Sequence, residues 1–248
     1  MESNHRSCAR LVHHGRMNCD RCWNNTSNRT QEAGSFRLVR DPGHWGSSNP
    51  ATLVLGISKG NTQSKAFTTE NFNGVAFKGI RDRLLQVLQT VGVLEGESLP
   101  RFERRFVSDE KEFAFASVVR CSLTGMDSKK LVHTADSGNV VPAPKASSAG
   151  YQFTSPCIDQ HLSNLPQATR RVLLLGNADD YIKHLSKQTS LARGGAQPIN
   201  DVAYLSSAVL FVHVSHPSKG NGHFGAFNLG KGTSGKKMLL AREALKTV

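Results

Sequence analysis

The sequence predicts an α/β protein with a central, mostly parallel four-stranded sheet between two layers of helices, a three-layer α/β/α arrangement. Two observations predict this fold class. Four short apolar runs rich in Val, Leu and Phe are typical of buried strands, and stretches with helical periodicity lie between and after them. The predicted strands are residues 51–57, 113–121, 171–176 and 208–216. The predicted helices are residues 77–92, 157–166, 178–188 and 235–248.

The strands are predicted from their composition and from what separates them. Three of the four are apolar without polar alternation, as expected for strands that helices cover on both faces. Strands that alternate with helices are joined by right-handed connections and run parallel. We therefore treat residues 1–248 as a single domain.

Each helix is predicted from periodicity or from an end signal. Residues 77–92 repeat apolar side chains at three- and four-residue steps and end near Gly92. Residues 157–166 are predicted to form a helix that Pro166 ends. Residues 178–188 open with acidic side chains, which are favourable at the positive end of a helix.

Two segments lack strong periodicity. Residues 1–50 are expected to form an arm that wraps around the core. Residues 123–150 are rich in Ser, Gly, Lys and Pro, so they bury little apolar area and are predicted to form a long flexible loop.

The composition points to a soluble protein with a polyanionic partner. The net charge of +12 and the pI near 9.8 favour nucleic acid as that partner, the alternative being a merely basic soluble protein. No apolar run reaches membrane-spanning length and no signal-peptide core is present near Met1, so we expect a cytoplasmic monomer that does not bind membranes. Cysteines in the cytoplasm are more often reduced or metal-bound than paired in disulfides.

A chemically unusual segment follows each predicted strand. These segments are "SKGNTQS", "SLTGMDSKK", "NADD" and "PSKGNGHFG". The carboxyl ends of parallel strands lie at one edge of the sheet, where ligands bind in open α/β folds. That edge is the predicted site.

Cys19 and Cys22 form a C-x-x-C in "NCDRCW". Such a pair can be a redox disulfide, half of a zinc site, half of an iron–sulfur site or a coincidence. A thioredoxin-like role is disfavoured, because that motif lies between a strand and a helix and this one precedes every predicted strand.

Three further motifs lie near strand ends. In "VSHPS", Pro217 turns the chain out of the sheet and leaves His216 facing the cleft, where a neutral imidazole can donate a hydrogen bond to a developing oxyanion. The loop "GISKGNTQ" places Gly56 and Lys59 where amides and charge can face an anion. In "GVAFKG", Phe77 can stack on a base. The alternatives are a structural histidine, a simple turn and a hydrophobic staple.

Taken in order, these motifs resemble the uracil-DNA glycosylase superfamily, most closely its iron–sulfur branch, often called family four. The branch opens with a C-x-x-C followed by an Arg-Thr or Arg-Arg pair, and this chain has Arg29 and Thr30 after "CDRCW". Its other cysteines end the second strand and begin the next helix, as in "RC" at Arg120–Cys121 and "CIDQHL" here. The resemblance covers residues 19–220.

The resemblance implies one [4Fe–4S] cluster, with a four-cysteine zinc site as the alternative. The implied ligands are Cys19, Cys22, Cys121 and Cys157, with Cys8 left over. Two close and two distant cysteines would fasten the N-terminal arm to the core.

The resemblance also implies the roles of the catalytic and DNA-binding residues. His216 would stabilise the uracil anion and Phe77 would stack on the base, while residues 219–227 would probe the duplex, with Phe224 or His223 as a wedge. The residues implied to contact the base or DNA are Gly56, Lys59, Gln63, Phe77, Ser218, Lys219 and Phe224.

Two family motifs are altered. Where the family has a water-activating carboxylate or Asn, this chain has Ile57 and Ser58, and the usual Pro is Lys59; a serine holds water but is a poor base. Asn61 and Gln63 are the nearby substitutes. Where the family has a base-reading Asn, this chain has Met126, followed by Asp127.

Three functions follow as hypotheses. The first is a divergent DNA glycosylase that acts in base-excision repair on a uracil-like or deaminated base, with His216, Ser58 and Asn61 as catalytic residues. The second is a catalytically impaired nucleic-acid-binding iron–sulfur protein of the same fold. The third is an unrelated metal-binding hydrolase or nucleotide-binding protein.

Overall fold

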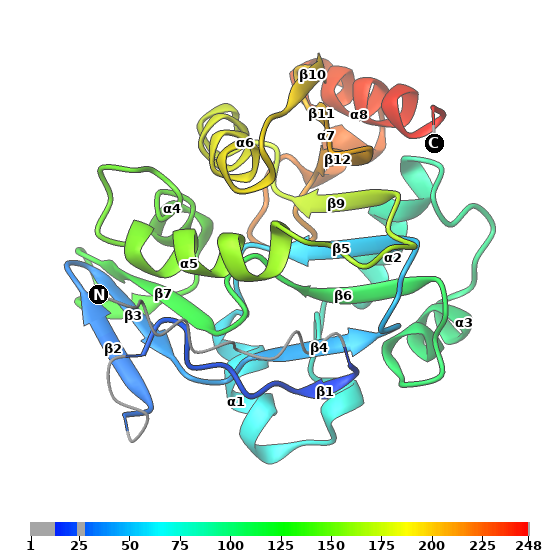
Figure 1. The fold of residues 1–248 in the computed structure, drawn as a ribbon. Coiled ribbons are helices and arrows are strands. Elements are labelled where there is room, and N and C mark those ends of the chain that lie inside the picture. Colours follow the sequence, from blue (N-terminus) through cyan, green and yellow to red (C-terminus); the bar gives the residue numbers. More distant parts are fainter. Residues whose placement is uncertain (1–12, 24–27, 248) are drawn as a thin grey trace.

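The fold is built on an eight-stranded mixed sheet with helices on both faces (Figure 1). The computed structural model describes residues 13–23 and 28–247. Cys8 therefore lies outside the described residues. Within the large sheet the strand order is β1-β4-β6-β5-β9-β12-β11-β10.

The four strands predicted from the sequence form the centre of this sheet, and their prediction is confirmed. They are β5 (Thr52–Gly56), β6 (Phe113–Ser117), β9 (Arg171–Leu175) and β12 (Val209–Val214). All three pairings among them are parallel, so their carboxyl ends share one edge.

The prediction of a four-stranded sheet is wrong in its extent, because antiparallel strands continue the sheet on both sides. On one side are β4 (Gly43–Gly46) and β1 (Gly15–Arg16), and on the other β11 (Ala203–Ser206) and β10 (Gln197–Asn200). These strands are two to four residues long and contain Gly, Pro or polar side chains, so they lack the apolar density of the central four.

A second sheet of four antiparallel strands lies beside the first. Its strands, in spatial order, are β2 (Thr30–Ala33), β3 (Phe36–Val39), β7 (Ser122–Asp127) and β8 (Val132–Thr134). The prediction of a loop over 123–150 is therefore wrong, since this segment holds most of β7, all of β8 and a short helix, α4 (Ser137–Val140). Leu38 and Leu123 are paired and fully buried here, so long-range pairing supplies the apolar contact that the local sequence lacks.

The four predicted helices are present with shifted ends. They are α2 (Arg81–Thr90), α5 (Tyr151–Leu162), α6 (Asp179–Arg193) and α8 (Gly232–Leu245). Helix α6 carries Asp179 and Asp180 in its first turn, as predicted, and ends at the left-handed Gly194. Helix α5 begins six residues earlier than expected and contains Pro156 in its interior.

Shorter helices complete the fold and were not predicted. They are α1 (Asn61–Thr69), α3 (Leu99–Glu103), α7 (Phe224–Asn228) and two 3₁₀ turns, η1 (Phe72–Gly74) and η2 (Arg104–Phe106). Helix α1 is largely polar and buries only Ala66 and Phe67, so it carries little helical periodicity.

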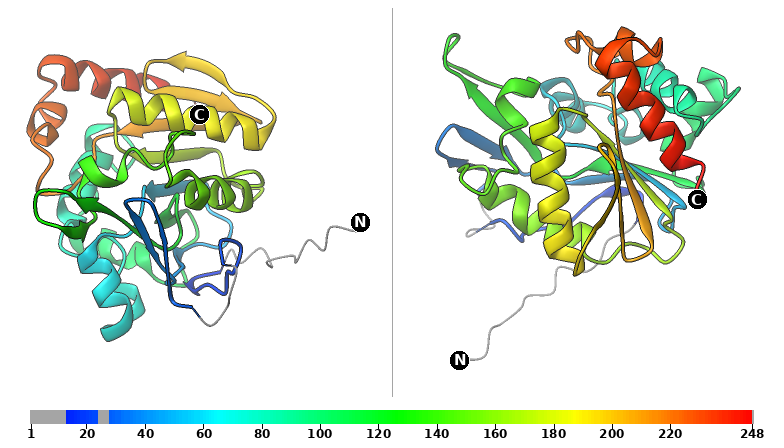
Figure 2. Two further views of the ribbon diagram at one scale, coloured as in Figure 1. Left: turned by 90° about the vertical axis from the view of Figure 1, so that its left-hand side faces the viewer. Right: turned by 90° about the horizontal axis from the view of Figure 1, so that it is seen from above.

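Alternate residues of the central strands pack on opposite faces of the large sheet. Leu53 and Leu55 of β5 pack in a core with α5 and α6, whereas Val54 between them packs in a core with α2 and α8. The view from above shows α6 and α8 on opposite sides of the sheet (Figure 2). No helix in the described part of the chain is long and apolar enough to cross a membrane.

Candidate functional site at the carboxyl ends of the strands

A cavity of about 790 Å³ lies at the carboxyl ends of β9 and β12. Its walls come from residues 176–181, from the loop that follows β12 and from the first turns of α8. The segments that follow β5 and β6 do not line it. The cavity therefore occupies only the half of the predicted edge that β9 and β12 form.

His216 is part of the cavity wall, as the sequence predicts. Its Nδ1 lies 3.1 Å from the backbone nitrogen of Ser218, whose N–H can only donate, so Nδ1 accepts and the neutral ring carries its proton on Nε2. Burial lowers the pKa of His216 to about 4. Near pH 7 the residue is therefore an uncharged hydrogen-bond donor.

The loop that carries His216 is braced from two sides. Asn221 donates from Nδ2 to the His216 carbonyl at 2.7 Å and to Ser215 Oγ at 3.0 Å. Arg83 on α2 donates to the carbonyls of Pro217 and Ser218 at 2.8 and 3.0 Å. These contacts hold the backbone of the loop from which the imidazole projects.

Phe77 is buried beside the end of β5. A Cβ on Gly56 would lie 3.6 Å from its ring, and the ring packs edge-on against Phe115. Its backbone φ is +53°, a strained value for an aromatic residue, and its N–H donates to Gln63 Oε1 at 2.9 Å. The structure thus brings together three residues implied to contact the base, although none of them lines the cavity.

The hydroxyl of Ser58 joins two parts of the fold. Its oxygen accepts from the N–H of Leu123 at 2.6 Å and donates to the carbonyl of Cys121 or Leu123, at 3.2 and 3.3 Å. The side chain therefore secures the start of β7 instead of facing the cavity. Asn61 is exposed at the first position of α1 and does not line the cavity.

Lys59 does not lie where a DNA phosphate can reach it, which corrects its predicted role. Its side chain is 1% exposed, and its ammonium group lies 3.3 Å from Asp41 Oδ1 and donates to the Arg120 carbonyl. Asp41 also accepts from the N–H and the hydroxyl of Ser122, at 2.7 and 2.6 Å. The pair is an internal brace.

The segment after His216 separates into exposed and buried residues. Lys219 and His223 are exposed, and His223 lines the cavity. Phe224 is only 8% exposed and lies under the Arg83 guanidinium, so the structure does not present it as a wedge. Of the two predicted wedge residues, His223 is the accessible one.

Met126 and Asp127 lie on the β7–β8 hairpin and do not line the cavity. The Asp127 carboxylate accepts from the N–H groups of Lys130 and Lys129, which lower its pKa in that order. This second altered motif therefore forms a turn.

The four cysteines implied as ligands come from three distant segments. Cys22, Cys121 and Cys157 contact one apolar cluster that includes Trp23 and Phe153. The Cys22 thiol, followed by burial, raises the pKa of Cys157, and burial raises the pKa of Cys121. All four cysteines, with Cys19, are free of disulfides.

The four cysteines carry the donor atoms that a thiolate-bound cluster or a zinc ion would use. Within residues 13–23 and 28–247, no three His, Cys, Asp or Glu side chains gather tightly enough to hold one metal ion. The thiolates of a [4Fe–4S] cube bind four separate iron atoms and therefore lie farther apart than the four ligands of one zinc ion. A buried cation, Arg120, lies close enough to Cys157 and Cys19 to interact with them electrostatically, and two of its nitrogens are buried without a hydrogen-bond partner.

No family model and no curated protein matches this chain. The site is therefore assessed from its own residues.

The sequence did not single out several residues of the cavity and of the surroundings of the four cysteines. Asn177 and Lys237 line the cavity, and the Lys237 ammonium bridges the Asn177 carbonyl to Asp179 at 2.7 and 2.5 Å. His44 and His161 lie close to Arg120 near the cysteines. His161 could have been found from the sequence, because it lies one helical turn after Cys157 on α5.

Proposed function

We propose that the protein is a divergent DNA glycosylase that hydrolyses the N-glycosidic bond of a flipped-out, uracil-like or deaminated base. The observation that carries the proposal is the neutral imidazole of His216, fixed through Nδ1 with its Nε2–H available at the cavity wall. Such a donor stabilises an oxygen that gains negative charge as the bond breaks.

The reaction needs little from the protein beyond this donor and a positioned water. When the bond between C1′ and the base breaks, its electron pair passes to the base, and a base oxygen accepts the hydrogen bond from His216 Nε2. Water then adds hydroxide to C1′, and its remaining proton neutralises the base. The glycosidic bond is unreachable inside the duplex, so the nucleotide has to enter the cavity extrahelically.

The cavity and the charge distribution support an extrahelical nucleotide. A volume of about 790 Å³ is in the range of small-molecule sites and exceeds that of a single base. Lys219 and Lys231 are exposed beside the cavity and are available for phosphates.

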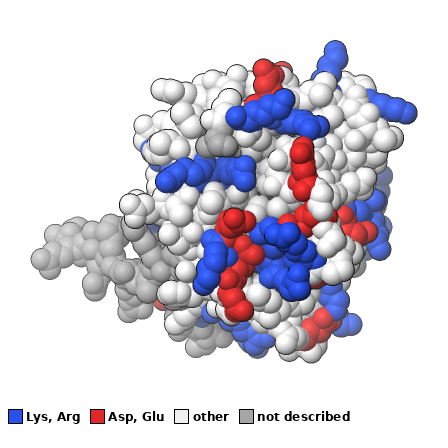
Figure 3. All heavy atoms as spheres, turned by 90° about the vertical axis from the view of Figure 1, so that its right-hand side faces the viewer, with Lys and Arg blue, Asp and Glu red and all other residues white. Residues whose placement is uncertain are grey.

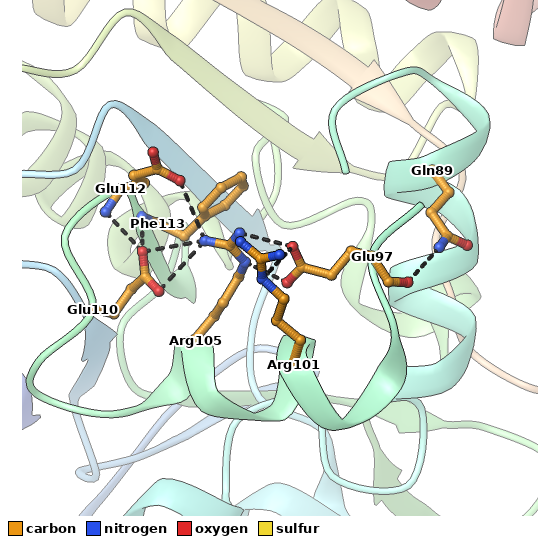
Figure 4. Close-up of polar contacts among 7 residues, drawn as sticks. All are labelled: Gln89, Glu97, Arg101, Arg105, Glu110, Glu112 and Phe113. Carbon is orange, nitrogen blue, oxygen red and sulfur yellow. Dashed lines mark hydrogen bonds and ion pairs between the residues drawn. The ribbon is translucent and has the colours of Figure 1, made fainter. Parts of the chain in front are cut away.

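The opposite edge of the sheet is unsuited to DNA. Six of the 19 acidic residues lie within residues 95–112, where Arg105 pairs with Glu97, Glu110 and Glu112 (Figure 4). The face seen from the right of Figure 1 shows Lys, Arg, Asp and Glu interspersed (Figure 3). The surplus positive charge is thus carried by residues outside this segment, and Lys231 and Lys237 are the Lys residues that line the cavity.

We also propose that Cys19, Cys22, Cys121 and Cys157 hold a [4Fe–4S] cluster, with zinc as the alternative occupant. These thiols would hold the segment before β2 against α5, and the cluster supplies a structural cross-link. We further infer that the protein acts in the cytoplasm as a monomer, where its free thiols stay reduced.

The test is a cleavage assay on oligonucleotides that carry uracil, hypoxanthine or another deaminated base. We expect abasic sites with the wild type and at least about a hundredfold slower release with His216→Ala, the usual size for losing an oxyanion donor. His223→Ala is the matched control, since His223 is exposed in the same loop. Equal rates for His216→Ala and the wild type would refute the assigned mechanism.

A second candidate is a catalytically impaired nucleic-acid-binding protein of the same fold. The observation in its favour is that the Ser58 hydroxyl is already bonded to the start of β7 and that Asn61 lies outside the cavity. Salt-sensitive binding to DNA without release of any base would support this candidate. Release that depends on His216 would exclude it.

A further inference from the structure

Arg120 is a buried cation in the link between β6 and β7. The residue is 5% exposed, and the Nε and Nη1 atoms of its guanidinium are buried without a hydrogen-bond partner. Its backbone carbonyl, in contrast, is bonded to the Lys59 ammonium. The chain therefore places two strong donors in its interior and supplies no protein acceptor for them.

The side chains that favour the charged form of Arg120 are cysteines. An arginine guanidinium is not deprotonated in proteins, so Arg120 brings a positive charge into the interior, close to Cys157 and Cys19. In the described part of the chain no carboxylate forms an ion pair with it. Two histidines near it, His44 and His161, have pKa values lowered first by burial and then by Arg120, and both are neutral near pH 7.

An unpaired buried charge of this kind destabilises a fold unless an anion accompanies it. The Arg120 backbone is also hydrogen-bonded to the Cys157 sulfur, so the residue adjoins that side chain. A thiolate-bound metal centre at the neighbouring cysteines would supply such an anion.

We propose that Arg120 is the built-in counter-ion of the negatively charged, thiolate-bound metal centre at Cys19, Cys22, Cys121 and Cys157. For an iron–sulfur cluster, reduction by one electron adds a negative charge to a centre that its thiolates already make negative. A fixed cation at this place raises the reduction potential and slows metal loss. The inference rests on the cofactor part of the proposed function and is independent of glycosylase chemistry.

The test compares Arg120→Met, Arg120→Lys and the wild type, each reconstituted anaerobically with iron and sulfide. We expect Arg120→Met to have a lower midpoint potential in dithionite titrations followed by visible absorption, and at least about tenfold faster iron loss to a chelator. Arg120→Lys keeps the charge and should lie between the two. Arg21→Met is the matched control, because Arg21 adjoins Cys22 but pairs with Asp159 at the surface.

A second measurement separates a counter-ion from a packing residue. In the metal-free protein, Arg120→Met removes an unpaired buried charge and should leave the unfolding midpoint in urea unchanged or raised. In the loaded protein the same change should lower that midpoint. A packing residue would lower both.

Each outcome decides the proposal. An unchanged potential and unchanged iron loss in Arg120→Met would overturn it, and so would a protein that binds neither iron–sulfur nor zinc. If the centre is zinc, the protein is colourless, and the proposal then requires faster zinc release from Arg120→Met. Absence of base release would refute the glycosylase and leave these readouts unaffected.

Discussion

The guanidinium of Arg83 lies over the ring of Phe224, with 3.6 Å from its central carbon to the ring centre. Two of its N–H groups donate to the carbonyls of Pro217 and Ser218, which belong to two consecutive peptide groups. Helix α2 thereby holds both the loop that positions His216 and the start of α7.

Replacement of Arg83 should loosen His216 without removing it. Arg83→Lys keeps a charge but loses the planar fork that bonds two carbonyls, so we expect base release to slow by about tenfold or more. The ring ¹⁵N shifts should show the Nε2–H form mixing with the other tautomer. Arg242→Met, which removes an exposed guanidinium paired with Glu95, is the control. An undisturbed tautomer in Arg83→Lys would contradict this account.

The Lys59–Asp41 pair should matter for stability and not for DNA binding. Asp41→Asn leaves the ammonium buried without a counter-charge, and we expect a loss of about 3–5 kcal/mol in the free energy of unfolding. Adding Lys59→Met should recover part of that loss. Glu95→Gln breaks an exposed pair and should cost no more than about 1 kcal/mol. Denaturant titrations measure all four proteins, and a neutral Asp41→Asn would be inconsistent with the brace.

The protein should lose stability in acid because of buried neutral histidines. Burial lowers the pKa of His213 to about 4, against an ordinary value of 6.5. Above pH 6.5 the imidazole is neutral in both the folded and the unfolded protein. Between pH 6.5 and 4 only the unfolded chain binds a proton at this residue, so the free energy of unfolding decreases as the pH is lowered through this range. The slope of the unfolding free energy against pH reports how many more protons the unfolded chain binds than the folded protein. His213→Asn should reduce that number by up to about one proton.

Thr189→Val is the control for this titration, because Thr189 is buried on α6 and carries no titratable group. This variant should shift stability equally at every pH. A slope for His213→Asn that equals the wild-type slope would show that His213 does not contribute to acid sensitivity.

Gly235 should tolerate no side chain. A Cβ there would lie 2.0 Å from the carbonyl carbon of Gly230, so Gly235→Ala has to move the first turn of α8 and the cavity wall beside it. We expect a loss of more than about 2 kcal/mol. Gly225→Ala on α7 meets nothing within 4 Å and should be neutral or stabilising. Thermal unfolding distinguishes the two, and equal midpoints would contradict the predicted clash.

The central strands were predictable because each carries its apolar density within its own residues. Residues 123–150 were not, since Leu123 becomes a strand residue through its pairing with Leu38, 85 positions earlier. The edge strand β4 likewise takes its partner from far away, since Trp45 pairs with Phe115 of β6. Local composition contains no trace of such partners.

The candidate site was predictable where its signal lies in neighbouring residues of the sequence. His216 follows from the strand that ends before it and the proline after it, and the structure places it at the cavity wall. The hydroxyl of Ser58 and the ammonium of Lys59 could not be assigned, because their partners Leu123 and Asp41 lie far away in the sequence. A short motif identifies a candidate residue but does not show whether its side chain faces solvent or the protein interior.

The separation of the cysteines along the chain constrains when their shared ligand can be acquired. Cys157 leaves the ribosome 138 residues after Cys19, so any group held by all four thiols can be completed only once α5 has been synthesised. Until then the early cysteines are unprotected thiols on a nascent chain. Delivery of the proposed metal centre would therefore be a late step in biogenesis, and a chain truncated before α5 could not hold it with all four thiols.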